Sequence, residues 1–143
     1  MPERPKRIHL LGKGRHEEAK AGGAIRPGDL IKLNSDGEVV IHATAGGSSE
    51  VAFALEDALQ GKSITQSYAE DDVVSYVLAD RGDVVFSYLS WGENVAIGDF
   101  LSSNGDGALR KVQGSDKPIA VALEALNLAD SESADERLRV RVL

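Results

Sequence analysis

Histidine and cysteine are the residues best able to bind metals or supply a nucleophile, and this chain of 143 residues is poor in both. It contains no cysteine, which excludes a thiolate nucleophile, a thiolate metal site and a disulfide. Its histidines are His9, His16 and His42, and their spacing matches no recognised metal-ligand motif. We therefore expect no bound metal and no other cofactor.

Asp29 and Asp99 are the carboxylates that could form a catalytic pair, because each follows a glycine in one of two similar segments. A hydrolase could use such a pair for acid and base catalysis. An aspartate after glycine in a turn also accepts hydrogen bonds from nearby backbone, and a repeated turn would place it twice. We predict this structural role, and since no G-x-S-x-G elbow, phosphate-binding loop or dinucleotide motif occurs, we predict that the protein is not an enzyme and has no catalytic residues.

Tyr88 and Trp91 close a strand-like run of β-branched and aromatic residues. Aromatic side chains are enriched both in protein cores and at interfaces. Both residues are therefore candidates for an interface, with a place in the core as the alternative.

The elements that would position these residues occur twice. IRPGDLIKLNSDGEVV resembles VAIGDFLSSNGDGALRKV, so that Gly28-Asp29 and Asp36-Gly37 recur seventy positions later. VAFALE matches IAVALE at an offset of 68, and AEDDVVSYVL weakly matches ADERLRVRVL at an offset of 65. Two copies indicate an internal duplication rather than a solenoid. We predict one β domain over 21–143, built from units at about 24–78 and 95–143.

Turn residues and alternation predict short strands throughout this domain. Pro27-Gly28-Asp29 is a turn, and Asp36-Gly37 favours a tight hairpin. DVVSYVLADRGDVVFSYLSW predicts a long hairpin, with Arg81-Gly82-Asp83 in its turn. The small-residue strands VAFAL and IAVAL are expected to pack in the core or between copies, and RLRVRVL to point its Leu and Val residues inward. Residues 127–136 are expected to form an acidic loop.

The first 20 residues differ from the rest in charge. They carry a formal +3, whereas the whole chain carries −7 and the remainder therefore −10. An acidic body disfavours binding to nucleic acid or to an anionic membrane. The segment has few apolar residues, so we predict a flexible basic arm, with at most one or two helical turns in HEEAKAGG. Its candidate partner-contact residues are Lys6, Arg7, Ile8, Leu10, Leu11, Lys13 and Arg15.

The order of these features resembles the decoration, or cement, proteins of tailed-bacteriophage capsids, of the lambda-like head decoration type. The segments that carry the resemblance are AGGAIRPGDLIKLNSDGEVV, VAFALEDAL, GDVVFSYLSWGENVAIGDFL and IAVALEAL. The resemblance implies an all-β, small β-barrel-like fold called a β-tulip, with an extended N-terminal arm. It also implies a homotrimer that binds the major capsid protein at capsomer junctions and stabilises the expanded shell.

A protein of this kind is expected on the exterior of the capsid in the virion, after synthesis in the host cytoplasm. Three alternatives stay open at this point. One is a β-clip module that binds a small ligand or carbohydrate near Tyr88, Trp91 and Glu93. Another is a hydrolase that uses Asp29 and Asp99, and the last is an inert monomer.

Overall fold

The computed structural model describes residues 4–47, 50–129 and 134–143. Thirteen short strands make up the fold, and the one helical element of this part of the chain is a 3-10 turn, η1 (Ala58–Gln60). No helix in the described ranges is long and apolar enough to cross a membrane. The prediction of an all-β, barrel-like fold is confirmed.

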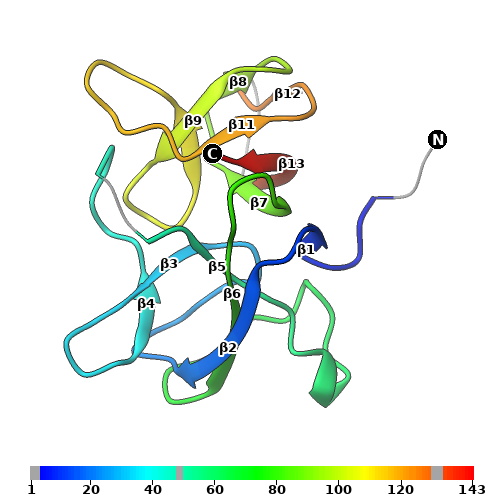
Figure 1. Cartoon of the computed structure of the whole chain (residues 1–143), viewed down its shortest axis with the longest axis vertical. Coiled ribbons are helices and arrows are strands. Elements are labelled where there is room, and N and C mark those ends of the chain that lie inside the picture. The colour runs from blue at the N-terminus through cyan, green and yellow to red at the C-terminus, as the bar shows by residue number, and fades with distance from the viewer. Residues whose placement is uncertain (1–3, 48–49, 130–133) are drawn as a thin grey trace.

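The first barrel is a five-stranded sheet in the order β2-β6-β5-β3-β4 (Figure 1). Its strands are β2 (Arg15–Lys20), β3 (Leu30–Leu33), β4 (Val39–Ile41), β5 (Ala52–Ala54) and β6 (Val73–Leu78). A parallel bridge from Ala21, just after β2, to Val39 in β4 joins the two edges of the sheet and closes the barrel.

The second barrel repeats this arrangement in the C-terminal half. β7, β10, β9, β11 and β13 follow one another around a sheet that closes through the pairing of β7 with β13, and β1 lies on its edge beside β7. Their bounds are β1 (His9–Leu11), β7 (Val84–Leu89), β9 (Phe100–Ser103), β10 (Leu109–Lys111), β11 (Ala120–Ala122) and β13 (Glu136–Val142). β8 (Asn94–Val95) and β12 (Leu126–Asn127) form a separate two-stranded sheet.

The strand registers of the two barrels correspond closely. Lys32 pairs with Val40 as Ser102 pairs with Arg110, seventy positions on. Leu30 pairs with Phe53 as Phe100 in the second barrel pairs with Val121, so the pairing of β3 with β5 has the same register as that of β9 with β11.

The last strand of each barrel shows where one predicted offset is wrong. Ala52 pairs with Leu78 and Ala120 pairs with Val142, so the strands correspond at an offset of 64 rather than 65. A shift of one residue would turn every side chain to the opposite face of its sheet. Only the offset of 64 superposes the buried Tyr76 on the buried Val140.

The predicted turns are confirmed. The Asn34 side chain accepts hydrogen bonds from the backbone N–H groups of Asp36 and Glu38 at 2.9 Å, and Gly37 adopts a positive φ of 77°. RLRVRVL forms most of β13, and Leu138, Val140 and Val142 are buried as expected. The expected acidic loop 127–136 includes residues 130–133, which lie outside the described residues.

The hairpin predicted for DVVSYVLADRGDVVFSYLSW is wrong. β6 pairs with β2 and β5 of the first barrel, whereas β7 pairs with β1, β10 and β13 of the second. The turn between them therefore connects two barrels rather than two paired strands. Each barrel also begins with a strand, β2 or β7, that precedes the unit boundaries predicted at 24 and 95.

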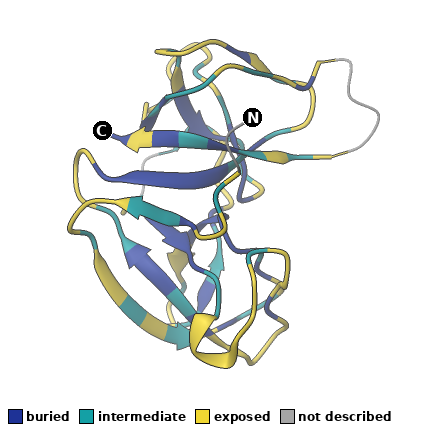
Figure 2. Ribbon diagram, turned by 90° about the vertical axis from the view of Figure 1, so that its right-hand side faces the viewer, coloured by how far each residue is buried: buried dark blue, intermediate teal, exposed yellow. Residues whose placement is uncertain are grey.

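Two hydrophobic cores stabilise the molecule, as Figure 2 shows by the buried stretches on strands of both barrels. The smaller core lies inside the first barrel and includes Val39 and Val74. The larger one fills the second barrel and continues into the first through Leu30, Phe53 and Val77. Ala52, Ala54, Ala120 and Ala122 are all buried, so the small-residue strands serve core packing.

Candidate functional site

The N-terminal segment, which the sequence assigns to partner contact, is largely part of the fold. β1 pairs with β7 of the second barrel, and β2 pairs along all six of its residues with β6 of the first. The prediction of a free arm is therefore wrong for residues 8–20, and the prediction of helical turns in HEEAKAGG is wrong as well. The intrinsic helix propensity of a few residues is small compared with a continuous strand pairing.

Ile8 corrects a predicted contact residue. Its side chain is 0% exposed and belongs to the larger core. Its carbonyl accepts a hydrogen bond from the Phe86 backbone N–H at 2.8 Å, and its own N–H donates to Glu56 Oε1 at 3.2 Å. Because Ile8 is buried within the chain, it is not available to anchor a partner.

The segment before Ile8 also follows the surface of the second barrel. Arg4 Nη1 donates to Glu124 Oε1 at 2.6 Å, and its guanidinium lies 5.1 Å from the centre of the Phe86 ring. Leu10 is half-buried against the core. The remaining predicted contact residues are exposed, namely Lys6, Arg7, Leu11, Lys13 and Arg15.

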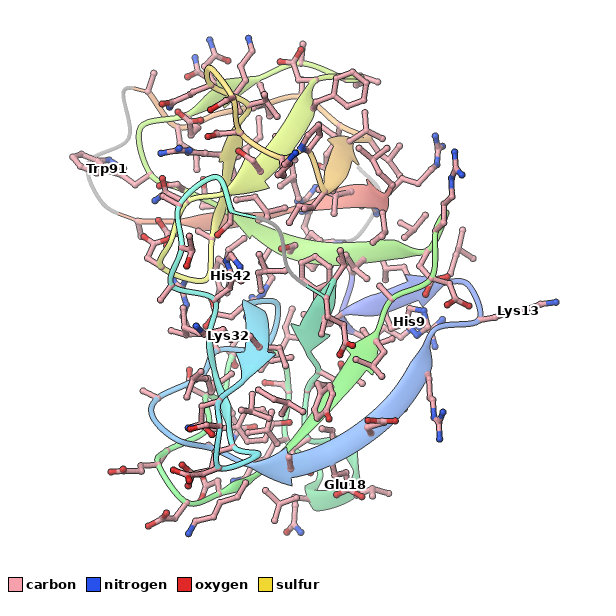
Figure 3. The ribbon with its side chains drawn as sticks, turned by 60° about the vertical axis from the view of Figure 1, so that its left-hand side comes forward. His9, Lys13, Glu18, Lys32, His42 and Trp91 are labelled. Carbon is pink, nitrogen blue, oxygen red and sulfur yellow. The ribbon has the colours of Figure 1, made fainter. Side chains whose placement is uncertain are left out.

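A buried aspartate organises the connection between β1 and β2. Asp83, only 2% exposed, accepts hydrogen bonds from the backbone N–H groups of Lys13 at 3.1 Å and Gly14 at 2.9 Å. One of its oxygens also lies 3.2 Å from His9 Nε2. The sequence marks Asp83 only as a turn residue, because its partners lie some seventy positions away. These bonds hold the Lys13 side chain so that it projects from the body, on the side opposite Trp91 in Figure 3.

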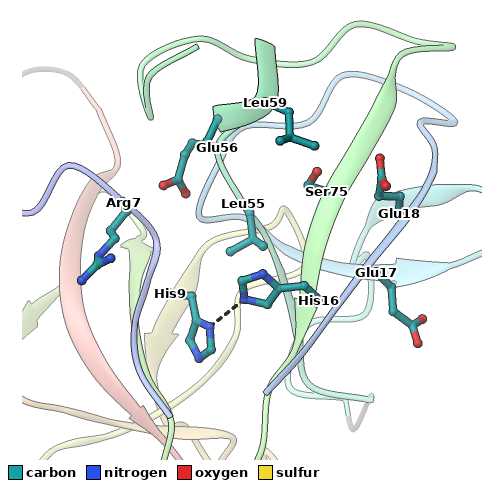
Figure 4. A pocket seen from close by; sticks show the side chains of 10 residues that line it. Arg7, His9, His16, Glu17, Glu18, Leu55, Glu56, Leu59 and Ser75 are labelled. Carbon is teal, nitrogen blue, oxygen red and sulfur yellow. Dashed lines mark hydrogen bonds between the residues drawn. The ribbon is translucent and has the colours of Figure 1, made fainter. Parts of the chain in front are cut away.

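A pocket of about 350 Å³ opens beside this connection (Figure 4). His9 Nδ1 and His16 Nε2 lie 2.8 Å apart at one wall, and Leu55 and Glu56 contribute to another. No group of three or more His, Cys, Asp or Glu side chains in the described part of the chain is arranged to hold a metal ion. The pocket therefore offers a histidine pair and nearby carboxylates, but no constellation for metal binding.

The predicted interface candidates lie in different surroundings. Tyr88 is half-buried between the guanidinium groups of Arg26 and Arg137, whose central carbons lie 3.9 and 4.5 Å from the ring centre. Burial raises the pKa of the Tyr88 phenol, although both guanidinium groups act in the opposite direction. Trp91 is 56% exposed, and its backbone N–H donates to Asp135 at 2.9 Å. Tyr88 thus joins the barrels within one chain, and Trp91 remains on the surface.

Asp29 and Asp99 do not form a carboxylate pair. Each accepts a hydrogen bond within its own turn, from the N–H of Arg26 at 2.8 Å and of Ala96 at 2.9 Å. Burial raises the pKa of Asp29 against the opposing effect of the Arg26 guanidinium, whereas the bond from Ala96 lowers the pKa of Asp99. The repeated turn accounts for both residues.

Sequence reasoning missed two exposed apolar residues of the second barrel. Ile97 and Phe100 are 70% and 53% exposed and flank Gly98-Asp99. Apolar residues at a glycine-aspartate turn are the signal that could have identified them. They place two exposed apolar side chains beside this turn of the second barrel.

Comparison with known proteins adds a structural likeness. No protein-family model matches the chain, and no curated protein matches it. The fold is similar to the crystal structure of the head fiber gp8.5 N base of bacteriophage phi29, with a TM-score of 0.61 and 11% sequence identity. The likeness covers 92% of this chain and 95% of the phage chain. At this identity it establishes a shared fold.

Proposed function

We propose that this protein is a structural component of a bacteriophage virion that binds the exterior of the capsid. The observation that carries the proposal is the likeness to the base of a phage head fiber, which extends over nearly the whole of both chains. A shared fold does not by itself imply a shared function. The likeness supports the same class of role as the independent resemblance of the sequence to capsid decoration proteins.

In its finer form, the proposal is that a homotrimer binds the major capsid protein at capsomer junctions and stabilises the expanded shell. Such a protein needs no active site, and we propose that it is not an enzyme. A ligand that binds only one state of a lattice stabilises that state by mass action. Contact across a junction would therefore oppose separation of the capsomers.

The exposed part of the N-terminal segment is the proposed contact with the capsid. Lys6, Arg7 and Lys13 are exposed cations beside an acidic body, so they suit an acidic patch on a partner. β1 is the outermost strand of its sheet. An edge strand can pair with an extended segment of another protein, which would gain main-chain hydrogen bonds.

Co-sedimentation with undecorated capsids tests the proposal. Deleting residues 1–20 would remove β1 and β2 and so disrupt both barrels. The informative variant is instead Lys6→Glu with Arg7→Glu, and the matched control is Lys32→Glu with Lys62→Glu, which reverses two exposed charges elsewhere. We expect saturable binding of the wild type and the control that weakens as the salt concentration rises, and weaker binding of the first variant at low salt. Failure of the wild type to bind its cognate capsids would refute the proposal.

A further inference from the structure

The two barrels of the chain contact each other in a head-to-tail manner. The glycine-aspartate turn of the first barrel, residues 26–29, packs against the second barrel. The Gly28 carbonyl accepts a hydrogen bond from Ser87 Oγ at 3.0 Å, and the Leu30 N–H donates to the Gly107 carbonyl at 2.8 Å. Leu30 is completely buried in this contact.

The equivalent turn of the second barrel, residues 96–99, has the same internal hydrogen bond but is exposed. Ile97 and Phe100 correspond to Pro27 and Leu30. A Cβ placed on Gly28 would lie 3.0 Å from the Phe86 carbonyl oxygen, whereas one placed on Gly98 meets no described atom within 4 Å. We call this turn the docking element. In the first barrel it is covered by the second barrel, whereas in the second barrel the equivalent turn at residues 96–99 lacks such a cover within the described ranges.

On the second barrel, the surface that covers the turn at residues 26–29 includes Gly107 and Arg137 and is here called the receiving surface. The equivalent surface of the first barrel is exposed. Gly107 approaches Asp29 so closely that a Cβ would lie 2.8 Å from its carboxylate, but its counterpart Gly37 has no such neighbour among the described residues. Arg137, which donates to the Pro27 carbonyl at 3.1 Å, corresponds by strand register to Val73. Val73, the first residue of β6, is an exposed apolar residue at 57%.

These differences define the symmetry of the contact. If the barrels were related by a two-fold axis, each turn would be covered by the other barrel. Only one is, so the contact is heterologous and leaves a docking element at one end and a receiving surface at the other. In Figure 1 the connection from β8 to β9 lies near the top of the molecule, and the end of β2, paired with the start of β6, near the bottom.

We propose that a second copy of this chain continues the same contact. The turn at residues 96–100 of one copy packs against the start of β6 and the β3–β4 turn of the next, with Ile97 facing Val73. The continuity with the contact already present inside the chain, and the exposed apolar residue on each side, favour this occupant. The inference rests on the self-association included in the proposed function. A heterologous contact produces a ring if the rotation closes and a filament if it does not.

Single cysteines test the pairing directly, because the natural chain has none. Ile97→Cys and Val73→Cys proteins are purified, mixed and treated with a short bismaleimide. We expect a cross-linked dimer from the mixture and only background product from either variant alone. Leu59→Cys, at a 90% exposed site outside both surfaces, replaces each partner in turn as the control. Cross-linking of Ile97→Cys to itself as readily as to Val73→Cys would overturn the proposal, and so would equal yields with the control.

A second measurement separates this inference from capsid binding. Light scattering on purified protein without capsids should show that wild type forms oligomers and that Ile97→Asp is reduced to single chains, while Leu59→Asp is unchanged. Wild-type protein that stays monomeric, or an oligomer unaffected by Ile97→Asp, would refute the self-contact and leave capsid binding to its own assay. If Ile97→Asp lost only capsid binding, the turn would belong to a capsid contact, which would also overturn the inference.

Discussion

Replacing Ile8 by alanine tests whether the N-terminal segment is part of the folded protein. The side chain is 0% exposed and packs in the core of the second barrel. Alanine removes three carbons, which at about 0.8 kcal/mol each costs about 2.4 kcal/mol of transfer free energy. A residual cavity of about 40 Å³ adds about 1 kcal/mol. We therefore expect Ile8→Ala to lower the free energy of unfolding by about 3 kcal/mol.

Leu11→Ala is the matched control, because Leu11 lies three positions away in the same segment but is 67% exposed. Substitutions at such surface positions usually change stability by less than about 0.5 kcal/mol. Urea unfolding followed by far-ultraviolet circular dichroism gives both values by linear extrapolation. Equal effects of the two variants, or an Ile8→Ala cost below about 0.5 kcal/mol, would show that β1 does not pack as described and refute the reasoning.

Three further predictions concern the turns, the acid limb of stability and the link between the barrels. Gly28→Ala should lower the melting temperature more than Gly98→Ala, because both glycines have a positive φ but only the first also has close neighbours. The Arg110 guanidinium and the Ser102 hydroxyl lower the pKa of Asp116 from 3.8 to about 2. The depressed pKa stabilises the fold above about pH 4, and this contribution is lost as pH falls towards 2. In Asp116→Asn, the free energy of unfolding should therefore fall less between about pH 4 and pH 2 than in the wild type, as unfolding measured across this pH range would show. Tyr88→Leu should lower the free energy of unfolding, measured in urea, by about 1–2 kcal/mol, because the guanidinium groups of Arg26 and Arg137 lose their aromatic partner.

The local turn chemistry of this protein could be predicted from sequence because it depends on few neighbouring residues. Gly37 supplies the positive φ, and Asn34 accepts the backbone hydrogen bonds that its position in the hairpin requires. The repetition of these turns also indicates a repeated strand arrangement. The strands between them are short, so the turns specify most of each β3–β4 type hairpin.

The partners of the longer strands could not be predicted in this way. β6 and β7 have the composition of a hairpin and are joined by a tight turn, yet each pairs with strands of its own barrel. β-propensity reports how well a residue packs on a pleated surface and does not specify which strand lies beside it. The first strands of the barrels, β2 and β7, share no evident sequence similarity, so the duplication revealed only the later strands.

The candidate site was difficult to predict for a related reason. A segment whose one apolar cluster is Ile8, Leu10 and Leu11 cannot form a core alone, and for this reason the sequence predicted a free arm over the first 20 residues. Ile8 is nevertheless buried because the second barrel supplies Phe86 and Val85 around it. Asp83 likewise holds the β1–β2 connection through partners that are distant in sequence. Burial of this kind depends on tertiary contacts that leave no local pattern.

The repeated Gly-Asp turn shows how one sequence motif can serve two purposes. Asp29 and Asp99 accept the same backbone hydrogen bond, yet burial raises the pKa of Asp29 and the turn bond lowers that of Asp99. The local bond forms the turn in both barrels, and the environments differ because Asp29 is buried beside the Arg26 guanidinium whereas Asp99 lies at the surface beside Lys111. The turn therefore has the same shape in the first barrel, where it is buried, and in the second barrel, where it is exposed. The exposed turn is therefore already in the conformation that docking requires, which reduces the entropy lost when a second chain binds to it.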